Sequence, residues 1–249
     1  MGEKSFLIDT TKCIGCGACS LACKGLNSLE PTEFNHEKIP HLSQNDWIVS
    51  FKNVRNPDAG ENACFITLMC NHCTEADCVK VCPSGAMKKK NDFVLIDPDK
   101  CIACGSCVEA CVYNAVFLGK NAGGRKLAKK CDACYSAFKN VPLCVSVCPT
   151  GALKFDYRLK MIKEANRRIS ALAKKYKSPS VYGLTEYGGL NVLTIVRTDD
   201  DLKAVKRKTA ANRIDRMIER SELFRIFNFF MPSFRTGKEY LYKILKSIV

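Results

Sequence analysis

The chain has 249 residues, of which 47% are hydrophobic and 26% charged, and its formal net charge is +14. This composition excludes a disordered chain, and the length exceeds that of the small secreted domains that rely on disulfides. No apolar run approaches the roughly 20 residues that a transmembrane helix needs, and the residues after Met1 lack the apolar segment of a secretory signal. We therefore expect reduced cysteines in a cytoplasmic protein, which is either free of the membrane or peripheral to it.

The 17 cysteines fall into four quartets, with Cys64 left over. In chain order the quartets are Cys13, Cys16, Cys19 and Cys23; Cys70, Cys73, Cys78 and Cys82; Cys101, Cys104, Cys107 and Cys111; and Cys131, Cys134, Cys144 and Cys148. The first and third have the spacing C-x2-C-x2-C-x3-C of bacterial ferredoxins, in which three close cysteines bind one 4Fe–4S cluster and the fourth binds another. Structural zinc fits less well, because it usually requires two separated C-x2-C pairs. The quartets therefore predict four 4Fe–4S clusters.

The quartets also alternate in type along the chain. The segment CIGCGACSLAC (13–23) resembles CIACGSCVEAC (101–111), and CVKVCPSGAM (78–87) resembles CVSVCPTGAL (144–153). Such a repeat indicates that a two-cluster ferredoxin unit was duplicated. We therefore predict an α+β fold with two bacterial ferredoxin-like units in residues 1–155.

Short apolar runs around the quartets predict the strands of these units. These runs lie at residues 6–8, 65–68, 93–96 and 153–155. The stretches after the cysteine triplets are predicted to be short helices, and Gly15, Gly17 and Gly105 suit a backbone that turns sharply beside a cluster. Residues 24–63 form an insert with a predicted strand at 47–51, and we expect this insert to be a covering layer that shields the clusters from water.

Beyond the last quartet the pattern changes. Residues 156–202 are predicted to form an extension, with an amphipathic helix at 159–176 and a buried strand at 190–196. The three aspartates at 199–201 are expected to mark an exposed turn. Residues 203–249 form a basic tail of amphipathic helices, which we expect to pack on a neighbouring subunit or to make peripheral contact with an anionic membrane.

The positive charge does not indicate nucleic-acid binding. An oxidised cubane with its four thiolates carries about −2, so four loaded clusters would offset more than half of the formal charge. No recognition helix or aromatic–basic sheet motif supports a nucleic-acid partner. The sequence also lacks a nucleophile–base pair, a phosphate-binding glycine loop and paired carboxylates, so we expect no catalytic site in this chain. The expected chemistry is one-electron transfer.

In their order and spacing, the quartets resemble those of the four-cluster iron–sulfur subunits of molybdenum or tungsten pterin oxidoreductases. That family serves formate dehydrogenases and dimethyl-sulfoxide, nitrate, polysulfide and arsenate reductases, and the similarity covers residues 5–155. It implies an anaerobic electron-transfer subunit whose partners are a molybdopterin catalytic subunit and a further electron carrier or membrane redox protein. Val181-Tyr182-Gly183 and the run from Gly188 to Leu193 resemble a segment of formate dehydrogenase beta subunits, which favours formate dehydrogenase or a related CO2 reductase. The same role in one of the reductases, or a free-standing polyferredoxin shuttle, is the alternative.

The resemblance also implies that the quartets pair in a nested way, the first with the fourth and the second with the third. The four ligand sets are then Cys13/Cys16/Cys19/Cys148, Cys131/Cys134/Cys144/Cys23, Cys70/Cys73/Cys78/Cys111 and Cys101/Cys104/Cys107/Cys82. Spacing alone does not settle this pairing, although the long stretch at 24–69 disfavours pairing of the first two quartets.

Two further residues have open interpretations. Cys64 is expected to be a free buried cysteine rather than a ligand. His72 lies inside the second quartet, where it either tunes a cluster potential through a hydrogen bond to sulfur or is a solvated loop histidine.

From the four quartets we expect about sixteen iron and about sixteen acid-labile sulfide per chain. Iron and sulfide analysis of anaerobically reconstituted protein measures both quantities. Iron near half of that value would contradict the assignment of four clusters.

Overall fold

The structure is a computed structural model that describes residues 3–32, 41–53, 64–135, 137 and 141–206. Contacts divide the chain into a unit of residues 1–205 and a second unit of residues 206–249. Apart from Lys206, the second unit lies outside the described residues, as does part of the insert predicted at 24–63. The interpretations of the tail and of the covering layer therefore stay predictions.

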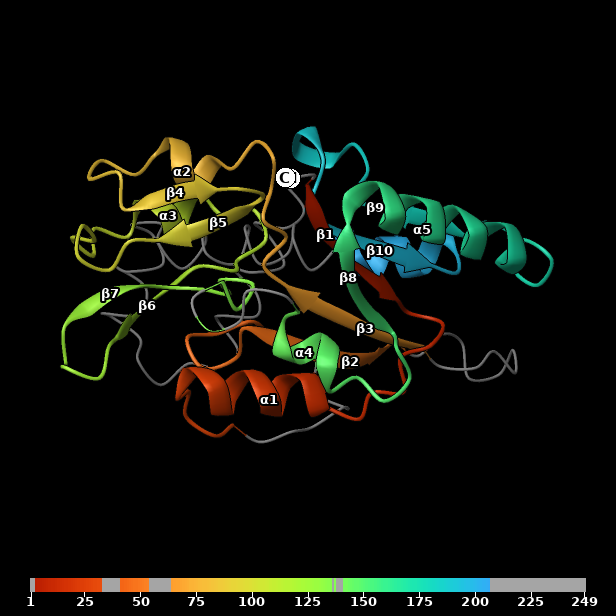
Figure 1. The fold of residues 1–249 in the computed structure, drawn as a ribbon, viewed down its shortest axis with the longest axis horizontal. Helices are drawn as coiled ribbons and strands as arrows, with labels where there is room; N and C mark the ends of the chain where they lie inside the picture. The colour runs from red at the N-terminus through yellow and green to blue at the C-terminus, as the bar shows by residue number, and fades with distance from the viewer. Residues whose placement is uncertain (1–2, 33–40, 54–63, 136, 138–140, 207–249) are drawn as a thin grey trace, which may run out of the picture. The chain divides into compact units, whose positions relative to one another are not determined.

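Strands and helices alternate along the described residues (Figure 1). The strands are β1 (Lys4–Asp9), β2 (Ile48–Asn53), β3 (Cys64–Met69), β4 (Met87–Lys90), β5 (Phe93–Ile96), β6 (Phe117–Lys120), β7 (Lys126–Lys129), β8 (Leu153–Tyr157), β9 (Ser180–Tyr182) and β10 (Val192–Val196). The helices are α1 (Ala18–Asn27), α2 (Asp77–Lys80), α3 (Ser106–Ala110), α4 (Leu143–Ser146), α5 (Arg158–Leu172) and the 3-10 helix η2 (Glu186–Gly188). The four strands predicted around the quartets are β1, β3, β5 and β8, and the mixture of helices and sheets confirms the α+β prediction. Within the described residues, no helix combines the length and the apolar character that a bilayer crossing requires.

Two pairs of helices correspond to the internal repeat of the quartets. α1 packs against α4, and α2 packs against α3; in Figure 1 the first pair lies at the bottom and the second pair at the upper left. α1 begins within the first quartet and α4 lies within the fourth, whereas α2 and α3 belong to the second and third. The chain therefore folds as two tandem ferredoxin-like units, and the last quartet completes the unit that the first quartet begins.

The unit that holds the first and fourth quartets is built on a four-stranded sheet with the strand order β8-β1-β10-β9. β1 pairs with β8 in the antiparallel sense and with β10 in the parallel sense. The other strands form the two-stranded sheets β2–β3, β4–β5 and β6–β7. Because β9 and β10 come from the segment after the last quartet, the predicted extension at 156–202 contributes two strands to the sheet of this ferredoxin-like unit.

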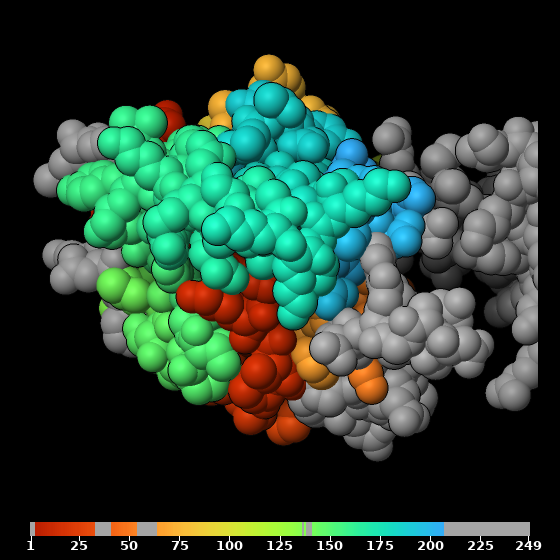
Figure 2. Space-filling view, turned by 90° about the vertical axis from the view of Figure 1, so that its right-hand side faces the viewer, coloured from red at the N-terminus to blue at the C-terminus, as the bar shows by residue number. Residues whose placement is uncertain are grey.

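α5 covers one face of the four-stranded sheet (Figure 1) and spans the surface seen in Figure 2. Its residues Met161 and Ala165 are buried together with Leu7 of β1 and with Leu193 and Ile195 of β10. The two helix residues are four positions apart, so they lie on the same side of the helix. The apolar pattern of the sequence thus predicted this helix, which ends at Leu172 rather than at the predicted position 176.

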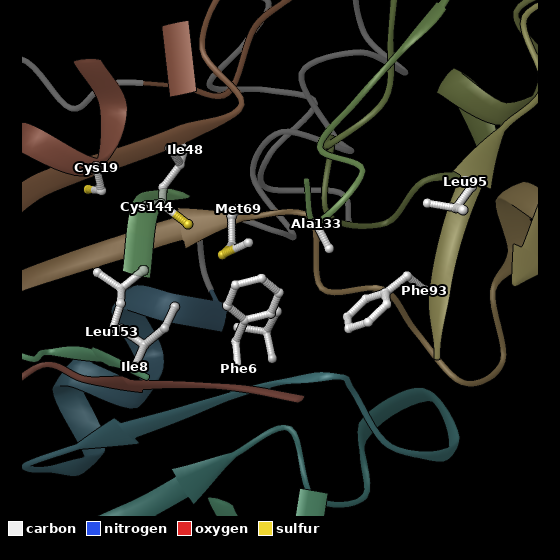
Figure 3. Packing of buried hydrophobic residues seen from close by; sticks show 11 residues of the cluster. Phe6, Ile8, Cys19, Ile48, Met69, Phe93, Leu95, Ala133, Cys144 and Leu153 are labelled. Carbon is white, nitrogen blue, oxygen red and sulfur yellow. The ribbon is translucent and has the colours of Figure 1, made fainter. Parts of the chain in front are cut away.

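The two ferredoxin-like units meet through three phenylalanine rings. The ring of Phe93 from β5 lies 6.2 Å from that of Phe6 in β1 and 5.8 Å from that of Phe155 in β8, and the latter two rings are 4.8 Å apart. Figure 3 shows Phe6 and Phe93 within the buried cluster, near Met69 and Ala133. Each such aromatic pair adds about 0.5–1.5 kcal/mol beyond the burial of its surface. This contact therefore helps to hold the two sets of quartets in a defined relation.

The prediction of an exposed turn at 199–201 is wrong for its last residue. Residues 199–206 are helical, and Asp201 has 0% of its surface exposed. Val205, which follows on the same helical segment, is buried in a core cluster. The helical segment thus continues across positions 202 and 203.

Asp201 is buried because it has several donors. One carboxylate oxygen accepts a hydrogen bond from Nε of Arg197 at 2.9 Å, and the other accepts one from Nδ2 of Asn53 at 2.9 Å and one from the thiol of Cys64 at 3.2 Å. These interactions hold the pKa of Asp201 below its usual value, although burial acts in the opposite direction. Cys64 is thus a buried cysteine engaged in a polar network, which agrees with its expected role as a free thiol.

The position of Asp201 predicts a large difference from its neighbour Asp200. Replacement of Asp201 by alanine removes the carboxylate from the buried Arg197 and should destabilise the protein by about 3–5 kcal/mol. Asp200 pairs with Lys203 at the surface, so Asp200→Ala should cost at most about 1 kcal/mol. Denaturant unfolding under anaerobic conditions measures both values. Equal effects of the two substitutions would contradict the assigned network.

Candidate metal centres

The four quartets share one backbone feature. In each C-x2-C segment the residue before the second cysteine has a positive φ, which is 70° at Gly15, 45° at His72, 56° at Ala103 and 57° at Ala133. This left-handed conformation is rare for residues that carry a side chain. Its recurrence in four segments of different sequence indicates a shared turn before the second cysteine of each quartet, and the fourth segment continues this conformation at Cys134, whose φ is 54°.

Backbone N–H groups point at several of the cysteine sulfurs. The Sγ atoms of Cys82, Cys101, Cys111 and Cys131 each accept a hydrogen bond from a main-chain N–H at 3.3 Å. For Cys82, burial raises the pKa, but hydrogen bonds, led by the one from the N–H of Met87, lower it on balance. Such donors stabilise the thiolate, which is the form that binds a metal.

The first and fourth quartets lie together. Burial raises the pKa of Cys19 to about 11, and the neighbouring thiols of Cys13 and Cys148 contribute to this shift. Burial is the main cause that raises the pKa of Cys23 to about 12, and the thiol of Cys134 is the next largest cause. The last cysteine of the fourth quartet therefore lies beside the first triplet, and the last cysteine of the first quartet lies beside the fourth.

The second and third quartets also lie together, and the last cysteine of each lies beside the other quartet. Burial raises the pKa of Cys73, and the thiols of Cys70 and Cys111 raise it further. Burial and the thiol of Cys82 are the leading causes that raise the pKa of Cys107 to about 11. Each of these quartets thus places its last cysteine beside the close triplet of the other, as in two-cluster bacterial ferredoxins.

We call each triplet together with the fourth cysteine beside it a group. Group 1 is Cys13, Cys16, Cys19 and Cys148; group 2 is Cys131, Cys134, Cys144 and Cys23; group 3 is Cys70, Cys73, Cys78 and Cys111; and group 4 is Cys101, Cys104, Cys107 and Cys82. Burial is the main cause of the raised pKa of Cys144, Cys131 and Cys78. A thiol of a neighbouring group raises each of these pKa values further. Cys19 of group 1 acts on Cys144, Cys70 of group 3 acts on Cys131, and Cys107 of group 4 acts on Cys78.

These links arrange the groups in the order 1, 2, 3, 4. The two exposed cysteines of the described chain, Cys16 and Cys104, belong to the terminal groups 1 and 4. The cysteines of groups 2 and 3 are buried or partly buried. The two outer groups therefore each have one exposed cysteine, whereas no cysteine of the two inner groups is exposed.

The chemistry of these donors fits 4Fe–4S clusters. Among the described residues, no three His, Cys, Asp or Glu side chains converge closely enough to hold a single metal ion. Four cysteine thiolates are the donors that a 4Fe–4S cluster requires, and each group contains four cysteines. Burial alone disfavours the charged thiolate and so raises the pKa of these thiols. Metal binding displaces the thiol proton and stabilises the thiolate, which makes its burial favourable.

His72 is not the solvated loop residue of the second interpretation. It is fully buried, and its Nδ1 accepts a hydrogen bond from the N–H of Val94 at 3.2 Å. Burial is the main cause that holds its pKa well below the usual value, so the imidazole is neutral. The proton must then be on Nε2, which has no hydrogen-bond partner among the described residues.

The glycine-rich segment after the last quartet supports the second quartet, a role that the sequence did not reveal. The N–H of Asn191 donates to the carbonyl of Asn71 at 3.0 Å, and its side-chain amide donates to the carbonyl of His72 at 3.2 Å. The carbonyl of Gly189 accepts a hydrogen bond from Thr74 at 3.0 Å. The run Gly-Gly-Leu-Asn was the available signal, but it was interpreted only as the start of a strand and as a resemblance to formate dehydrogenase beta subunits.

Comparison with known proteins agrees with this geometry. Residues 12–86 and residues 62–158 each match a family model described as a 4Fe-4S dicluster domain. The chain is 38% identical over 178 residues to the probable anaerobic dimethyl sulfoxide reductase chain YnfG of Escherichia coli (strain K12), which covers 69% of this chain and 81% of that protein. It is 38% identical over 157 residues to the thiosulfate reductase electron transfer subunit PhsB of Salmonella typhi, with 60% and 73% covered. It is 31% identical over 212 residues to the nitrate-inducible formate dehydrogenase iron-sulfur subunit of Escherichia coli (strain K12), with 80% and 69% covered.

The first C-x2-C loop predicts the effect of a single methyl group. A Cβ at Gly15 would lie 2.2 Å from the ring of Phe65, and its φ of 70° is unfavourable for alanine. Gly15→Ala should therefore destabilise the protein by about 1–3 kcal/mol and weaken iron retention. Gly25→Ala in α1 is the control, because no atom lies within 4 Å of its Cβ position and alanine favours a helix by about 0.5–1 kcal/mol. Unfolding midpoints and iron content measure both effects, and equal stability of the two variants would contradict the loop geometry.

Proposed function

Because the chain belongs to the family of 4Fe–4S electron-transfer subunits that serve anaerobic oxidoreductases, we propose that it holds four 4Fe–4S clusters and connects a molybdenum or tungsten pterin subunit to a further electron carrier. The observation that carries this proposal is the nested arrangement of the cysteines, in which the last cysteine of every quartet lies beside the close triplet of another quartet. The chain has no catalytic site of its own in this proposal. Bond-making chemistry belongs to the partner.

We propose groups 1 to 4 as the four ligand sets. Their membership is supported by the neighbours of Cys19, Cys23, Cys73 and Cys107, which come from both quartets of each nested pair. The shared left-handed loop supports the same role for all four quartets, including the two whose spacing departs from that of bacterial ferredoxins.

A 4Fe–4S cluster supplies one-electron redox chemistry, at a potential that the protein sets within about −700 to +450 mV. The residues of this chain contribute burial, thiolate ligands and N–H donors to sulfur, as at Cys82 and Cys101. The row of groups supports a path between two surface sites, at the exposed Cys16 and Cys104. The inner groups, which have no exposed cysteine, form the middle of that path.

We further propose that the catalytic partner is a formate dehydrogenase or a formate-linked CO2 reductase. The formate dehydrogenase relative matches 80% of this chain, so the match extends into the segment after the last quartet. That segment contains Asn191 and Gly189, which hold the second quartet in place. The part of the chain that matches this relative therefore includes the segment that supports a cluster-binding loop.

A sulfoxide or thiosulfate reductase is the second candidate, because the relatives named for these enzymes have the higher identity of 38%. A free polyferredoxin shuttle is the third. A shuttle needs little beyond its clusters, whereas β9, β10 and α5 form a substantial addition to the first ferredoxin-like unit. This addition favours a permanent subunit of a complex.

Anaerobic purification of the native protein tests the proposal. We expect a larger subunit that contains molybdenum or tungsten to co-purify, together with formate-dependent reduction of a viologen dye. Oxidation of reduced viologen by dimethyl sulfoxide or thiosulfate, without formate activity, would replace the first candidate by the second. Purification of the chain alone, with its iron intact, would favour the shuttle.

Two cysteine variants separate ligands from other thiols. Cys134→Ser should perturb one cluster, so that iron falls by at most about one quarter and one electron paramagnetic resonance (EPR) signal changes. Cys64→Ser should leave the iron content unchanged, because Cys64 hydrogen-bonds to Asp201 and lies outside the four groups. Loss of iron from the Cys64 variant alone would contradict the proposed ligand sets.

A further inference from the structure

Lys130 is a buried cation between the two ferredoxin-like units. Only 3% of its surface is exposed, although lysine is among the residues that are least often buried. It follows β7 and directly precedes Cys131 of group 2. Its Nζ donates to the carbonyl of Val94 in β5 and, at 2.5 Å, to the carbonyl of Cys131. Both acceptors are neutral, so these hydrogen bonds orient the ammonium group without neutralising it.

A buried positive charge is costly unless negative charge lies near it. The groups around Lys130 supply such charge once their thiols bind metal. Lys130 lies against residues of both inner groups, since its Nζ donates to the carbonyl of Cys131 in group 2 and to the carbonyl of Val94, whose N–H donates to His72 in the loop that carries Cys70 and Cys73 of group 3. The same ammonium is therefore close to ligands from both inner groups.

The hydrogen bonds around Val94 fix this position. The carbonyl of Val94 accepts from Lys130, and its N–H donates to Nδ1 of His72, a residue of the second quartet. A single residue of β5 thus connects the second quartet to the start of the fourth. A side chain anchored at both Val94 and Cys131 cannot turn toward solvent without breaking two buried hydrogen bonds.

We propose that Lys130 is an electrostatic tuning residue, which raises the reduction potentials of the clusters in groups 2 and 3 by holding a positive charge near both. Reduction adds one negative charge to a cluster that already carries about −2 with its thiolates. A fixed cation stabilises the reduced form more than the oxidised form, so the potential rises. Because Lys130 itself is buried, its charge is screened less than a surface charge. The inference rests on the proposed four-cluster function.

The test is an EPR-monitored redox titration of the loaded protein. Lys130→Met removes the charge in a side chain of similar length, and Lys130→Gln removes the charge but keeps an N–H donor for the carbonyls. Both variants should shift the midpoint potentials of two clusters to more negative values and leave the other two unchanged. Lys126→Met, an exposed position on β7, is the matched control and should shift none.

Unchanged potentials in Lys130→Gln with full iron content would overturn this inference and leave the four-cluster function intact. Loss of iron from both neutral variants, with full iron in Lys130→Arg, would also overturn it, because Lys130 would then maintain the fold rather than set a potential. Equal shifts in all four clusters would contradict a local effect. Low iron in the wild-type protein itself would instead contradict the proposed function.

Discussion

The left-handed residue in each C-x2-C segment is the constraint on which the rest of the structure depends. At Gly15, His72, Ala103 and Ala133 the backbone has a conformation that costs free energy for any residue with a side chain. The surrounding fold must therefore impose it. At the first loop, the ring of Phe65 occupies the space where a Cβ would lie, and at the second, Asn191 holds the neighbouring carbonyls. Packing by the strands and by the extension thus maintains the loops that present the sulfurs.

Charge is the second organising influence. Thiols with raised pKa values are concentrated in a small volume, and burial is the main cause of the increase at Cys19, Cys73 and Cys131. The protein offsets this with N–H donors to sulfur and with a buried ammonium at Lys130. Part of the positive charge in the composition therefore lies inside the protein, at Lys130.

The sequence predicted the elements that depend on local pattern. β1, β3, β5 and β8 lie where the apolar runs predicted strands, because each run places apolar side chains into a buried core. For β1, β5 and β8 this is the core of Phe6 and Phe93, and for β3 it is the core that includes Ile66. The helix at α5 follows from its apolar spacing. The prediction was wrong at Asp201, since three adjacent aspartates are typical of an exposed turn and the donors that bury the last of them come from distant parts of the chain, Asn53 and Cys64 among them.

By itself, the sequence determined the chemistry of this protein, because the identity and spacing of close cysteines are local properties that specify iron–sulfur ligation. It also determined the α+β fold through the repeated quartets and the apolar runs. Only the tertiary structure decided which fourth cysteine lies beside which triplet, since that depends on how α1 meets α4 and α2 meets α3. The contacts of Asn191, His72 and Lys130 were decided in the same way. Their partners are backbone groups of loops and strands that are mostly far away in the sequence, and no local pattern records such contacts.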